Sequence, residues 1–488
     1  MALPLFAYLC RRNGRSTAAG RREFLRMSLA CGAASLISNR SRAPAAAPKL
    51  QQRVVVVGAG LAGLACGHEL RAAGYDVLVV DGRRRIGGRV LSFHDFVPGK
   101  HVEAGGEFIG SNHPTWAAYA DQFGLEFLDV SEDEDLDMPV HICGKMWSPA
   151  EVARLYEEMD TATAAMTELA ASINADEPWA SPDAELLDNR TIAAWIAELS
   201  ISDEAKSLVA VQISSDNAIA NDKASLLGML AAVQGGGGER YWTDTETYRC
   251  VGGNQVLAQR LLDGIGVDNV LLGDPVASVD RLGAGVRVSL KGGRVIECDE
   301  VVLATPPSTW RHIRFEPGMP ERLKPQMGIA CKHMIALPSR FWKDAGLSQY
   351  GLSDGPVAQT WELTDAQTTG DPDAALVAFS GGPSAAMCLD FAKEERDDKY
   401  ATEIDRLFPG AKEKTRGRRT LDWPNDPATL AGYSFPAPGE VTTVAKDLHA
   451  GLEKIHFCGE HACPKFVGYM EGALNSGVSV AKRLAGRG

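Results

Sequence analysis

The chain has 488 residues, of which 45% are hydrophobic and 23% charged, and its formal net charge is −13. This length exceeds what one compact core fills and predicts two domains, while the composition is that of a globular protein with no apolar run long enough to span a bilayer. The acidity argues against nucleic acid or an anionic membrane as a partner, and its field would either attract cations such as protonated amines or serve only solubility.

The first 47 residues differ in kind from the rest. Arg21 and Arg22 precede a mildly apolar run, Met27 to Ile37, and a small-residue stretch, Ala43 to Ala47. This order is typical of a twin-arginine export signal, which serves proteins that fold before export. We therefore expect a periplasmic or secreted protein. The alternative is a cytoplasmic protein with a basic leader.

The next segment has the periodicity of a strand, a helix and a second strand. The valines from Val54 to Val57 predict a strand buried on both faces, Leu61 to Ala72 predict a helix, and Val77 to Val80 predict the second strand. A βαβ unit of this kind is the start of many nucleotide-binding folds.

Three glycines lie between the first strand and the helix, and an acid ends the second strand. Gly58, Gly60 and Gly63 form G-x-G-x-x-G, and Asp81 follows 23 residues after the first of them. The glycines allow a tight turn that brings a helix N-terminus against a pyrophosphate, and the acid can accept hydrogen bonds from ribose hydroxyls. The segment therefore predicts a bound dinucleotide.

A second glycine turn identifies the dinucleotide. Arg83 and Arg89 begin and end the run R-x-R-x-G-G-R, in which two adjacent glycines permit another close backbone approach and the arginines can neutralise a diphosphate. With this turn the chain resembles the FAD-dependent amine oxidases, which include monoamine, polyamine and amino-acid oxidases. The resemblance implies FAD as the cofactor.

The resemblance also implies an α/β fold with a discontinuous Rossmann-like FAD-binding domain and an inserted mixed α+β substrate domain. The FAD-binding parts are expected at 50–128, 249–314 and 421–488, and the substrate parts at 129–248 and 315–420. Residues Gly105 and Gly106 lie in VEAGGEFIG, which in the family approaches the flavin, and Val276 matches the valine whose backbone holds the adenine end.

Lys332 lies in a predicted strand, Ala330 to Leu337, nine residues ahead of Phe341 and Trp342. In the family a lysine at this spacing holds a water molecule against flavin N5. The resemblance therefore implies a catalytic role for Lys332.

Two further runs near the C-terminus resemble the family, and they hold the remaining candidate residues. Gly459 and Glu460 would meet the ribityl–phosphate section of FAD, and a helix from Glu471 would direct its positive end at the flavin N1–C2=O edge. Tyr433 and Tyr469 align with the two tyrosines of the family's aromatic cage, which guides an amine toward the flavin. Trp423 and Met470 complete the predicted cofactor contacts.

Two further features, a cysteine that could bind the flavin covalently and a complete set of metal ligands, are missing from the sequence. Gly432 occupies the position of the cysteine that carries covalent flavin in mammalian-type monoamine oxidases, so we expect non-covalent FAD. Cys458, His461 and Cys463 lack a fourth ligand, so no metal site is expected.

The implied reaction is oxidation of a small-molecule amine to an imine, which hydrolyses to an aldehyde or ketone plus ammonia or an amine, with O2 reoxidising the flavin to give H2O2. The alternatives are an L-amino-acid oxidase or tryptophan 2-monooxygenase, and an amine dehydrogenase that uses a protein electron acceptor. The carboxylate-binding arginine of an amino-acid oxidase has no recognisable motif here. The oligomeric state is open, with a homodimer as one alternative.

Overall fold

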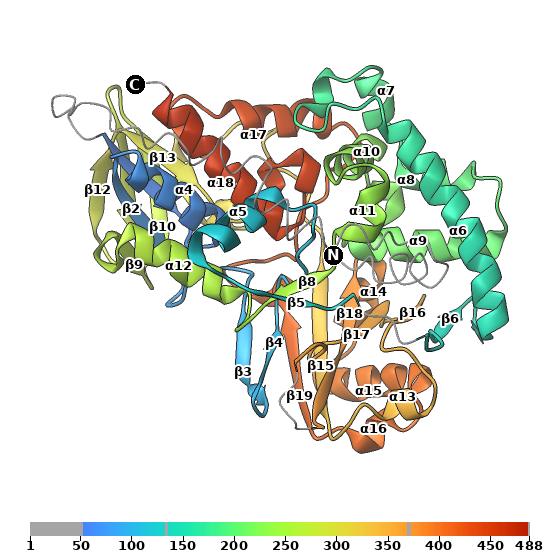
Figure 1. The fold of residues 1–488 in the computed structure, drawn as a ribbon. Coiled ribbons are helices and arrows are strands. Elements are labelled where there is room, and N and C mark those ends of the chain that lie inside the picture. Colours follow the sequence, from blue (N-terminus) through green and yellow to red (C-terminus); the bar gives the residue numbers. More distant parts are fainter. Residues whose placement is uncertain (1–51, 132–134, 368–371, 487–488) are drawn as a thin grey trace.

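The computed structural model describes residues 52–131, 135–367 and 372–486. The expected export signal lies outside these residues. Figure 1 shows three parts: a sheet with helices at the left, a helical block at the upper right, and a second large sheet with short helices below it.

The left part is built on a parallel five-stranded sheet in the order β20-β13-β1-β2-β9. Its strands come from three separate stretches of the chain, as the discontinuous α/β fold class required. The strands are β1 (Arg53–Val57), β2 (Asp76–Asp81), β9 (Val270–Leu272), β13 (Glu300–Leu303) and β20 (Ile455–Phe457). The Rossmann-like fold class is therefore confirmed, while the domain boundaries stay a prediction.

The valines of β1 serve two different cores, because successive side chains of a strand point to opposite faces. Val54 and Val56 pack in the cluster that includes helices α4 (Leu61–Ala72), α12 (Gln255–Ile265) and α18 (Met470–Ala485). Val55 and Val57 pack in the cluster on the other side. That side is covered by a four-stranded sheet of β10 (Val276–Arg281), β11 (Val286–Leu290), β12 (Val295–Cys298) and β14 (Arg314–Glu316).

The lower part is a seven-stranded sheet in the order β19-β15-β18-β17-β16-β6-β7. Five of its six strand pairings are antiparallel, and β6 pairs in parallel with β16, with Val140 opposite Leu352. The two inserted segments of the chain thus meet in one sheet. Its strands are β6 (Val140–Ile142), β7 (Lys145–Met146), β15 (Ala330–Leu337), β16 (Gly351–Ser353), β17 (Gln359–Glu362), β18 (Ala374–Gly381) and β19 (Gly417–Asp422).

The helical block lies against one face of this sheet, and short helices lie against the other (Figure 1). The block contains α6 (Pro149–Ala170), α7 (Ala184–Asp188), α8 (Ile192–Ala197), α9 (Asp203–Asp216), α10 (Leu226–Gly235) and α11 (Glu239–Asp244). The other face carries α13 (Phe341–Asp344), α14 (Pro383–Leu389), α15 (Arg396–Leu407) and α16 (Ala411–Lys414). The remaining elements are α5 (Pro114–Phe123), α17 (Lys446–Ala450), β3 (Ser92–Val97), β4 (Lys100–Glu103), β5 (Phe127–Asp129) and β8 (Tyr248–Cys250).

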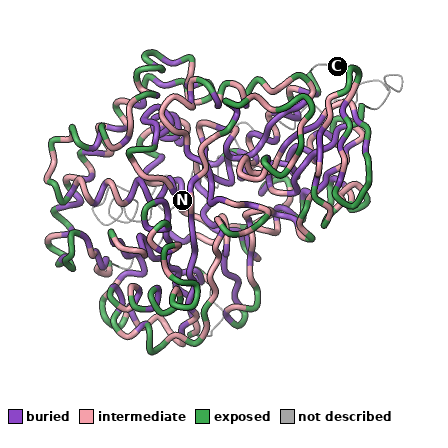
Figure 2. The backbone as a smooth tube through the Cα atoms, turned by 180° about the vertical axis from the view of Figure 1, so that it is seen from behind, coloured by how far each residue is buried: buried purple, intermediate pink, exposed green. Residues whose placement is uncertain are grey.

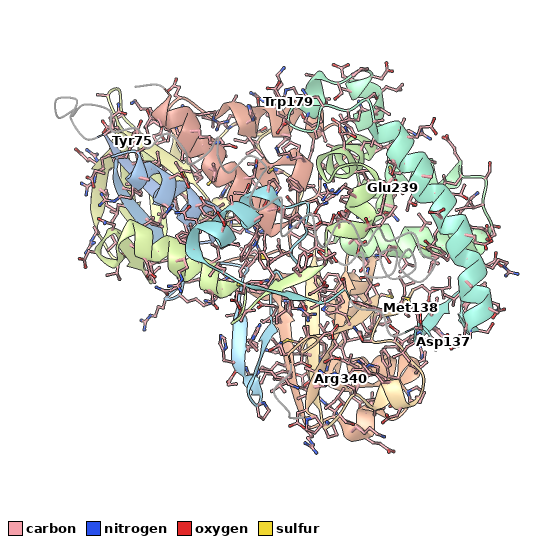
Figure 3. The ribbon with its side chains drawn as sticks, viewed as in Figure 1. Tyr75, Asp137, Met138, Trp179, Glu239 and Arg340 are labelled. Atoms are coloured by element: carbon pink, nitrogen blue, oxygen red, sulfur yellow. The ribbon has the colours of Figure 1, made fainter. Side chains whose placement is uncertain are left out.

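Burial follows these layers, with the central strands buried and the outer helical faces exposed (Figure 2). Arg340, labelled in Figure 3, follows β15 and forms an ion pair with Glu362 of β17 near the lower end of the seven-stranded sheet. Its guanidinium donates two hydrogen bonds, of 2.6 and 3.0 Å, to the buried carboxylate of Glu362. Within the described part of the chain, no helix is both long and apolar enough to cross a membrane.

Candidate active site

A cavity of about 470 Å³ extends from the glycine turn after β1 to the face of the seven-stranded sheet. Of the sequence-predicted site residues, all but Gly63 line it. They are Gly58, Gly60, Asp81, Arg83, Arg89, Gly105, Gly106, Val276, Lys332, Trp423, Tyr433, Gly459, Glu460, Tyr469 and Met470. Residues separated by hundreds of positions in the chain therefore surround one space, and the roles proposed for them remain predictions.

The second and third glycines of the G-x-G-x-x-G turn differ in what they require. A Cβ on Gly63 would lie 1.9 Å from the carbonyl oxygen of Gly58, so this glycine permits the helix to approach the strand. A Cβ on Gly60 would meet nothing closer than 3.9 Å, and Gly60 lines the cavity. Gly60 thus leaves room for a ligand to approach the backbone at the start of α4.

Asp81 lies at the end of β2, where its carboxylate organises the turn. Oδ2 accepts a hydrogen bond of 2.6 Å from the backbone N–H of Ala59, and Oδ1 accepts one of 2.7 Å from that of Arg83. Burial raises the pKa of this carboxyl above its ordinary value. Asp81 therefore links the glycine turn to the arginine turn at the cavity wall.

The two predicted arginines are held by carboxylates. Arg83 makes a two-pronged pair with Asp426, at 2.6 and 3.0 Å. Arg89 donates 2.9 Å hydrogen bonds to Oε1 of Glu460 and to the carbonyl of Gly432. Both guanidinium groups are fixed in place at the wall of the cavity, because paired planar groups restrict each other's orientation.

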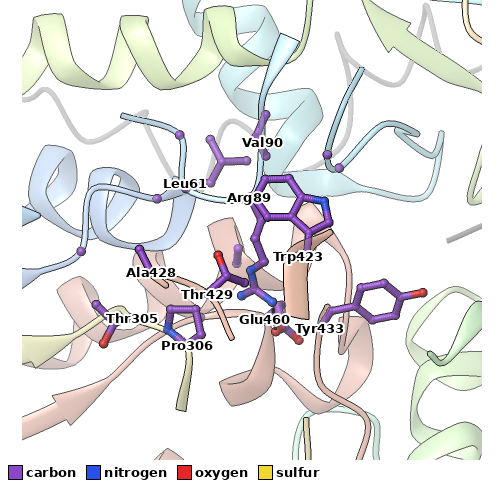
Figure 4. Close-up of a pocket in the computed structure, with 18 of the residues that line it drawn as sticks. Leu61, Arg89, Val90, Thr305, Pro306, Trp423, Ala428, Thr429, Tyr433 and Glu460 are labelled. Atoms are coloured by element: carbon purple, nitrogen blue, oxygen red, sulfur yellow. Dashed lines mark hydrogen bonds and ion pairs between the residues drawn. The ribbon is translucent and has the colours of Figure 1, made fainter. Parts of the chain in front are cut away.

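Figure 4 shows Arg89 reaching toward Glu460 beside the indole of Trp423, with Tyr433 beyond them. Burial opposes ionisation of Glu460, but Arg89, His461 and the hydroxyl of Ser434 outweigh it and lower the pKa. Glu460 therefore carries its charge inside the protein and anchors the arginine next to the cavity.

Lys332 faces the cavity because β15 alternates. Ala330 and Met334, on the same face, belong to the core on the cavity side, whereas Ile335 and Leu337 pack against the outer helices. The Lys332 ammonium donates to Oε2 of Glu107 at 2.6 Å and to the carbonyls of Gly105 and Glu103 at 2.9 and 3.3 Å. Its three protons therefore all have protein acceptors.

Glu107 also pairs with a second buried cation that the sequence did not single out. Arg249, on β8, approaches Oε1 of Glu107 to 2.8 Å, and both side chains are at most 3% exposed. Arg249 donates a further 2.6 Å hydrogen bond to the carbonyl of Glu362. No local motif marks this network, since its members come from separate segments.

The two tyrosines are buried and each is held by neighbours. The hydroxyl of Tyr433 donates to the backbone carbonyls of Asp216, at 3.0 Å, and Ser215, at 3.3 Å. The ring of Tyr469 meets His113 at a centroid distance of 5.7 Å, and its hydroxyl interacts with that of Tyr241. Both rings are therefore fixed at the cavity wall.

An aromatic wall that sequence reasoning missed lies beside Lys332. Trp361 of β17 contacts Phe108 and Phe379, each at a centroid distance of 5.5 Å, and the Lys332 ammonium lies 5.3 Å from the Trp361 ring. All three rings line the cavity. Alternation along β18 is the signal that would have placed Phe379 there, because Phe379 lies opposite Lys332 in the sheet.

The last helix begins as expected at the cavity, since α18 starts at Met470. The next residue, Glu471, turns away from the cavity: its carboxylate accepts 2.9 Å hydrogen bonds from the backbone N–H groups of Thr115 and Trp116, at the start of α5. Burial raises the pKa of Glu471 to about 7. This carboxylate ties the first turns of the two helices together.

Gly432 is tightly enclosed. A Cβ there would lie 2.8 Å from the backbone nitrogen of Ala330 and 2.9 Å from its Cβ. A cysteine side chain at this position would need the neighbouring strand to move. Position 432 therefore has neither a thiol nor the space for one.

The residues present fit FAD. A diphosphate needs backbone that it can approach closely and positive charge beside it. The cavity offers both, through Gly60, the N-termini of α4 and α18, and the two fixed arginines. Val276 lines the same space. The far end is walled by aromatic rings, as a flat apolar ring system requires. No cluster of His, Cys, Asp or Glu that could hold a metal ion occurs among residues 52–131, 135–367 and 372–486.

This fold and cavity define a dinucleotide-binding flavoprotein. The family model for flavin-containing amine oxidoreductases matches residues 61–485, and the chain belongs to that family.

Curated relatives span most of the chain. An L-amino acid dehydrogenase of Synechocystis sp. is 24% identical over 90% of this chain and 96% of its own length. Human amine oxidase [flavin-containing] B is 28% identical over 88% of this chain and 85% of its own length. A putrescine oxidase of Kocuria rosea is 31% identical over 71% of this chain and 77% of its own length.

The solved structures agree with this family. Cyclohexylamine oxidase from Brevibacterium oxydans superimposes with a TM-score of 0.79 and 28% identity, covering 90% of this chain and 99% of that one.

Proposed function

We propose that the protein oxidises a small-molecule amine with FAD as its cofactor. The observation that carries this proposal is the meeting, in one cavity, of the glycine and arginine turns with Lys332, Tyr433 and Tyr469. When bound, FAD supplies a two-electron acceptor for the hydride equivalent that leaves the carbon next to the amine nitrogen.

The chain's own residues would hold the cofactor and exclude water. Gly60 and the N-terminus of α4 would receive the diphosphate, with Arg89 held against Glu460 nearby. Asp81 would accept hydrogen bonds from ribose hydroxyls, and Val276 would hold the adenine end. We infer non-covalent binding, because Gly432 offers neither a thiol nor space for one.

At the other end, the residues would orient the substrate. Tyr433 and Tyr469 would flank the neutral amine and exclude bulk water, and their ring faces tolerate residual positive charge. Lys332, fixed by Glu107, would order a water molecule there in place of its longest contact, the 3.3 Å hydrogen bond to the carbonyl of Glu103. The oxidised product is an imine, which water converts to an aldehyde or ketone plus ammonia or a smaller amine.

The test is an anaerobic screen in which purified holoenzyme is mixed with amines and amino acids while the flavin band at ~450 nm is followed. Bleaching by one or more amines is the expected result. Bleaching by amino acids alone would replace this proposal with the L-amino-acid oxidase or tryptophan 2-monooxygenase alternative. The similarity to an L-amino acid dehydrogenase is the observation that favours that alternative.

The electron acceptor forms a separate part of the proposal. We infer that O2 reoxidises the flavin and yields H2O2, whereas an amine dehydrogenase would pass electrons to a protein. Measuring H2O2 against aldehyde separates the two: one peroxide per aldehyde supports O2, and aldehyde formed without peroxide in the presence of an added electron acceptor supports a dehydrogenase.

We also propose export through the twin-arginine route, on the basis of residues 1–47. Cell fractionation of the wild type and of a variant with Arg21→Lys and Arg22→Lys tests this. We expect the wild type outside the cytoplasm and the variant inside it. Equal distribution of both would leave the cytoplasmic alternative. Sedimentation of the same material tests for a homodimer.

A further inference from the structure

The two ends of the cavity differ in their exposure to solvent. Among the described residues that line it, those that are exposed lie near Asp81 and Val276, at the end predicted to hold the adenosine of FAD. They are Gly82, Pro275, Lys291, His312 and Pro427. At the opposite end Lys332, Tyr433 and Tyr469 are buried. The flavin ring, held at the buried end, therefore has its way to solvent past the adenosine end.

A short segment, residues 426–429, forms one wall of this exposed end, and we call it the strap. Pro427 is exposed and Thr429 is buried, yet both line the cavity. The cavity and the solvent thus touch opposite sides of the same segment. The strap lies between two fixed points, because Trp423 is buried and Gly432 has no room for a Cβ.

Side-chain hydrogen bonds attach the strap to both neighbouring walls. On one side the guanidinium of Arg83 donates to the two carboxylate oxygens of Asp426, at 2.6 and 3.0 Å, and to Oγ1 of Thr429, at 2.7 Å. On the other side the hydroxyl of Ser308 donates to the carbonyl of Thr429. Figure 4 shows Thr429 beside Pro306, which lines that side. The strap therefore bridges two lining segments from different parts of the chain.

The pair of Arg83 and Asp426 is the strongest of these attachments. Both side chains are partly buried, with 16% and 26% exposure. Burial opposes ionisation of Asp426, but Arg83 outweighs it and lowers the pKa of this carboxyl. Both groups are therefore charged near neutral pH, and a two-pronged contact between charged planar groups is stronger than a neutral hydrogen bond.

The backbone at the end of the strap depends on these contacts. Leu430, directly after it, has a φ of +55°, which residues other than glycine seldom adopt. The N–H groups of Thr429 and Leu430 both donate to the carbonyl of Asp426, at 3.0 and 2.8 Å. Such a conformation persists only where the surroundings enforce it. Loss of the ion pair would thus favour other conformations of the strap.

We propose that FAD leaves and enters the protein by opening of the strap, and that Asp426 is a positioning residue that keeps the strap closed by pairing with Arg83. Arg83 then acts on the cofactor through the strap, in addition to lining its site. The proposal concerns retention of FAD and does not depend on which substrate FAD oxidises.

The first experiment follows release of the cofactor. Holoenzyme that carries radiolabelled FAD is mixed with excess unlabelled FAD, and the label that stays with the protein on gel filtration is counted over time. Asp426→Asn removes the charge and keeps an oxygen for the N–H of Ala428, whereas Asp426→Glu keeps the charge. The control is Asp95→Asn, because Asp95 forms a two-pronged pair with Arg419, at 2.8 Å for both contacts, away from the cavity.

We expect Asp426→Asn to release FAD roughly 10- to 100-fold faster than the wild type. Asp426→Glu should lie between the two, and Asp95→Asn should match the wild type. A gate slows entry and exit alike, so the Kd for FAD, measured by equilibrium dialysis of the holoenzyme, should change far less than the release rate. If the Kd rises by the same factor as the release rate, the pair contributes to affinity and the proposal is wrong.

The second experiment tests whether the strap moves. Hydrogen–deuterium exchange of the holoenzyme, read by mass spectrometry, reports the opening of the N–H groups of Thr429 and Leu430. We expect peptides that contain the strap to exchange faster in Asp426→Asn than in the wild type, and peptides from α4 to exchange alike in both. Faster release of FAD without faster exchange in the strap would overturn the proposal.

Thr429→Val is an independent variant, since it removes the 2.7 Å contact with Arg83 and nearly keeps the volume of the side chain. It should release FAD roughly 2- to 10-fold faster than the wild type. If Asp426→Asn fails to fold, unchanged release and exchange in Thr429→Val refute the proposal. Both experiments follow FAD and not turnover. Failure of every amine to reduce the flavin would therefore refute the proposed amine oxidation and leave the role of the strap to be decided by these measurements.

Discussion

The ammonium of Lys332 lies 2.6 Å from Oε2 of Glu107, and the other oxygen of that carboxylate lies 2.8 Å from Arg249. One buried carboxylate thus holds two cations from different strands. Because Lys332 lines the cavity and Arg249 does not, Glu107 connects the wall of the active site to the packing behind it.

Replacing Lys332 by methionine should leave FAD bound and slow turnover by roughly 100-fold or more, because a group positioned to hold water or move a proton contributes about that much. Steady-state and stopped-flow kinetics with one amine measure this. Lys324→Met, at an exposed site, is the matched control and should behave like the wild type. Unchanged kinetics in Lys332→Met would remove the lysine from the mechanism.

Replacing Arg249 by methionine should destabilise the fold by about 3–5 kcal/mol, since it removes one partner of a buried ion pair and leaves part of the carboxylate charge uncompensated. Urea unfolding measures the change. The exposed pair of Arg287 and Glu297 provides the comparison, and Arg287→Met should cost no more than about 1 kcal/mol. Equal losses at the two sites would contradict the importance of the buried network.

Replacing Gly432 by alanine should also destabilise the protein, by about 1–3 kcal/mol, because the new Cβ would lie 2.8 Å from the backbone nitrogen of Ala330. The control is Gly283→Ala, where a Cβ would meet nothing within 4 Å. Thermal unfolding of the two variants should differ clearly. If Gly432→Ala melts at the same temperature as Gly283→Ala, the strand near Gly432 has room that the structure does not show.

Acid precipitation of the holoenzyme should release the yellow cofactor into the supernatant, since nothing at Gly432 can form a thioether with it. Absorbance of the supernatant and the pellet measures the release. Colour that stays with the pellet would show a covalent link formed elsewhere in the chain.

The carboxyl of Asp216 makes stability fall as pH rises. Burial raises its pKa to about 8, so the folded protein keeps this proton over a range, above pH ~4, in which the unfolded chain has released it. The folded state therefore binds more protons there, and the free energy of unfolding declines until about pH 8. Asp216→Asn does not titrate, so its melting temperature relative to the wild type should rise between pH 5 and pH 8.

Thermal unfolding at four or five pH values tests this difference, in which the titration of all other groups cancels. The hydrogen bonds that Asp216 accepts from Gln212, at 2.7 Å, and Gln359, at 2.9 Å, can be rearranged by rotating those amides. A difference that stays constant with pH would contradict the raised pKa.

The βαβ unit and the strand of Lys332 could be predicted from the sequence because their signals are local. The helix over Leu61–Ala72 and the strand over Ala330–Leu337 have the bounds that their periodicity indicated. Strands β6 and β7 were not predicted, since each is two or three residues long and β6 depends on a partner, β16, far along the chain.

The candidate site divides in the same way. The lining residues that lie in glycine-rich or family-like runs were found, whereas Glu107, Arg249 and Trp361 were not singled out. The place of each of these residues in the site depends on a neighbour from another segment of the chain. The carboxylate of Glu107, which joins Lys332 to Arg249, is an example. A single sequence contains no local pattern for such a contact.

Strand β20 and helix α18 complete the parallel layer long after β1 and α4 have been synthesised. Synthesis must therefore continue past Ile455 before Glu460 can pair with Arg89 and the wall of the cavity can form. Until then the four valines of β1 have only part of their final cover, and exposed apolar surface of this kind promotes aggregation. Closure of the cavity around its cofactor therefore requires that synthesis has passed Glu460.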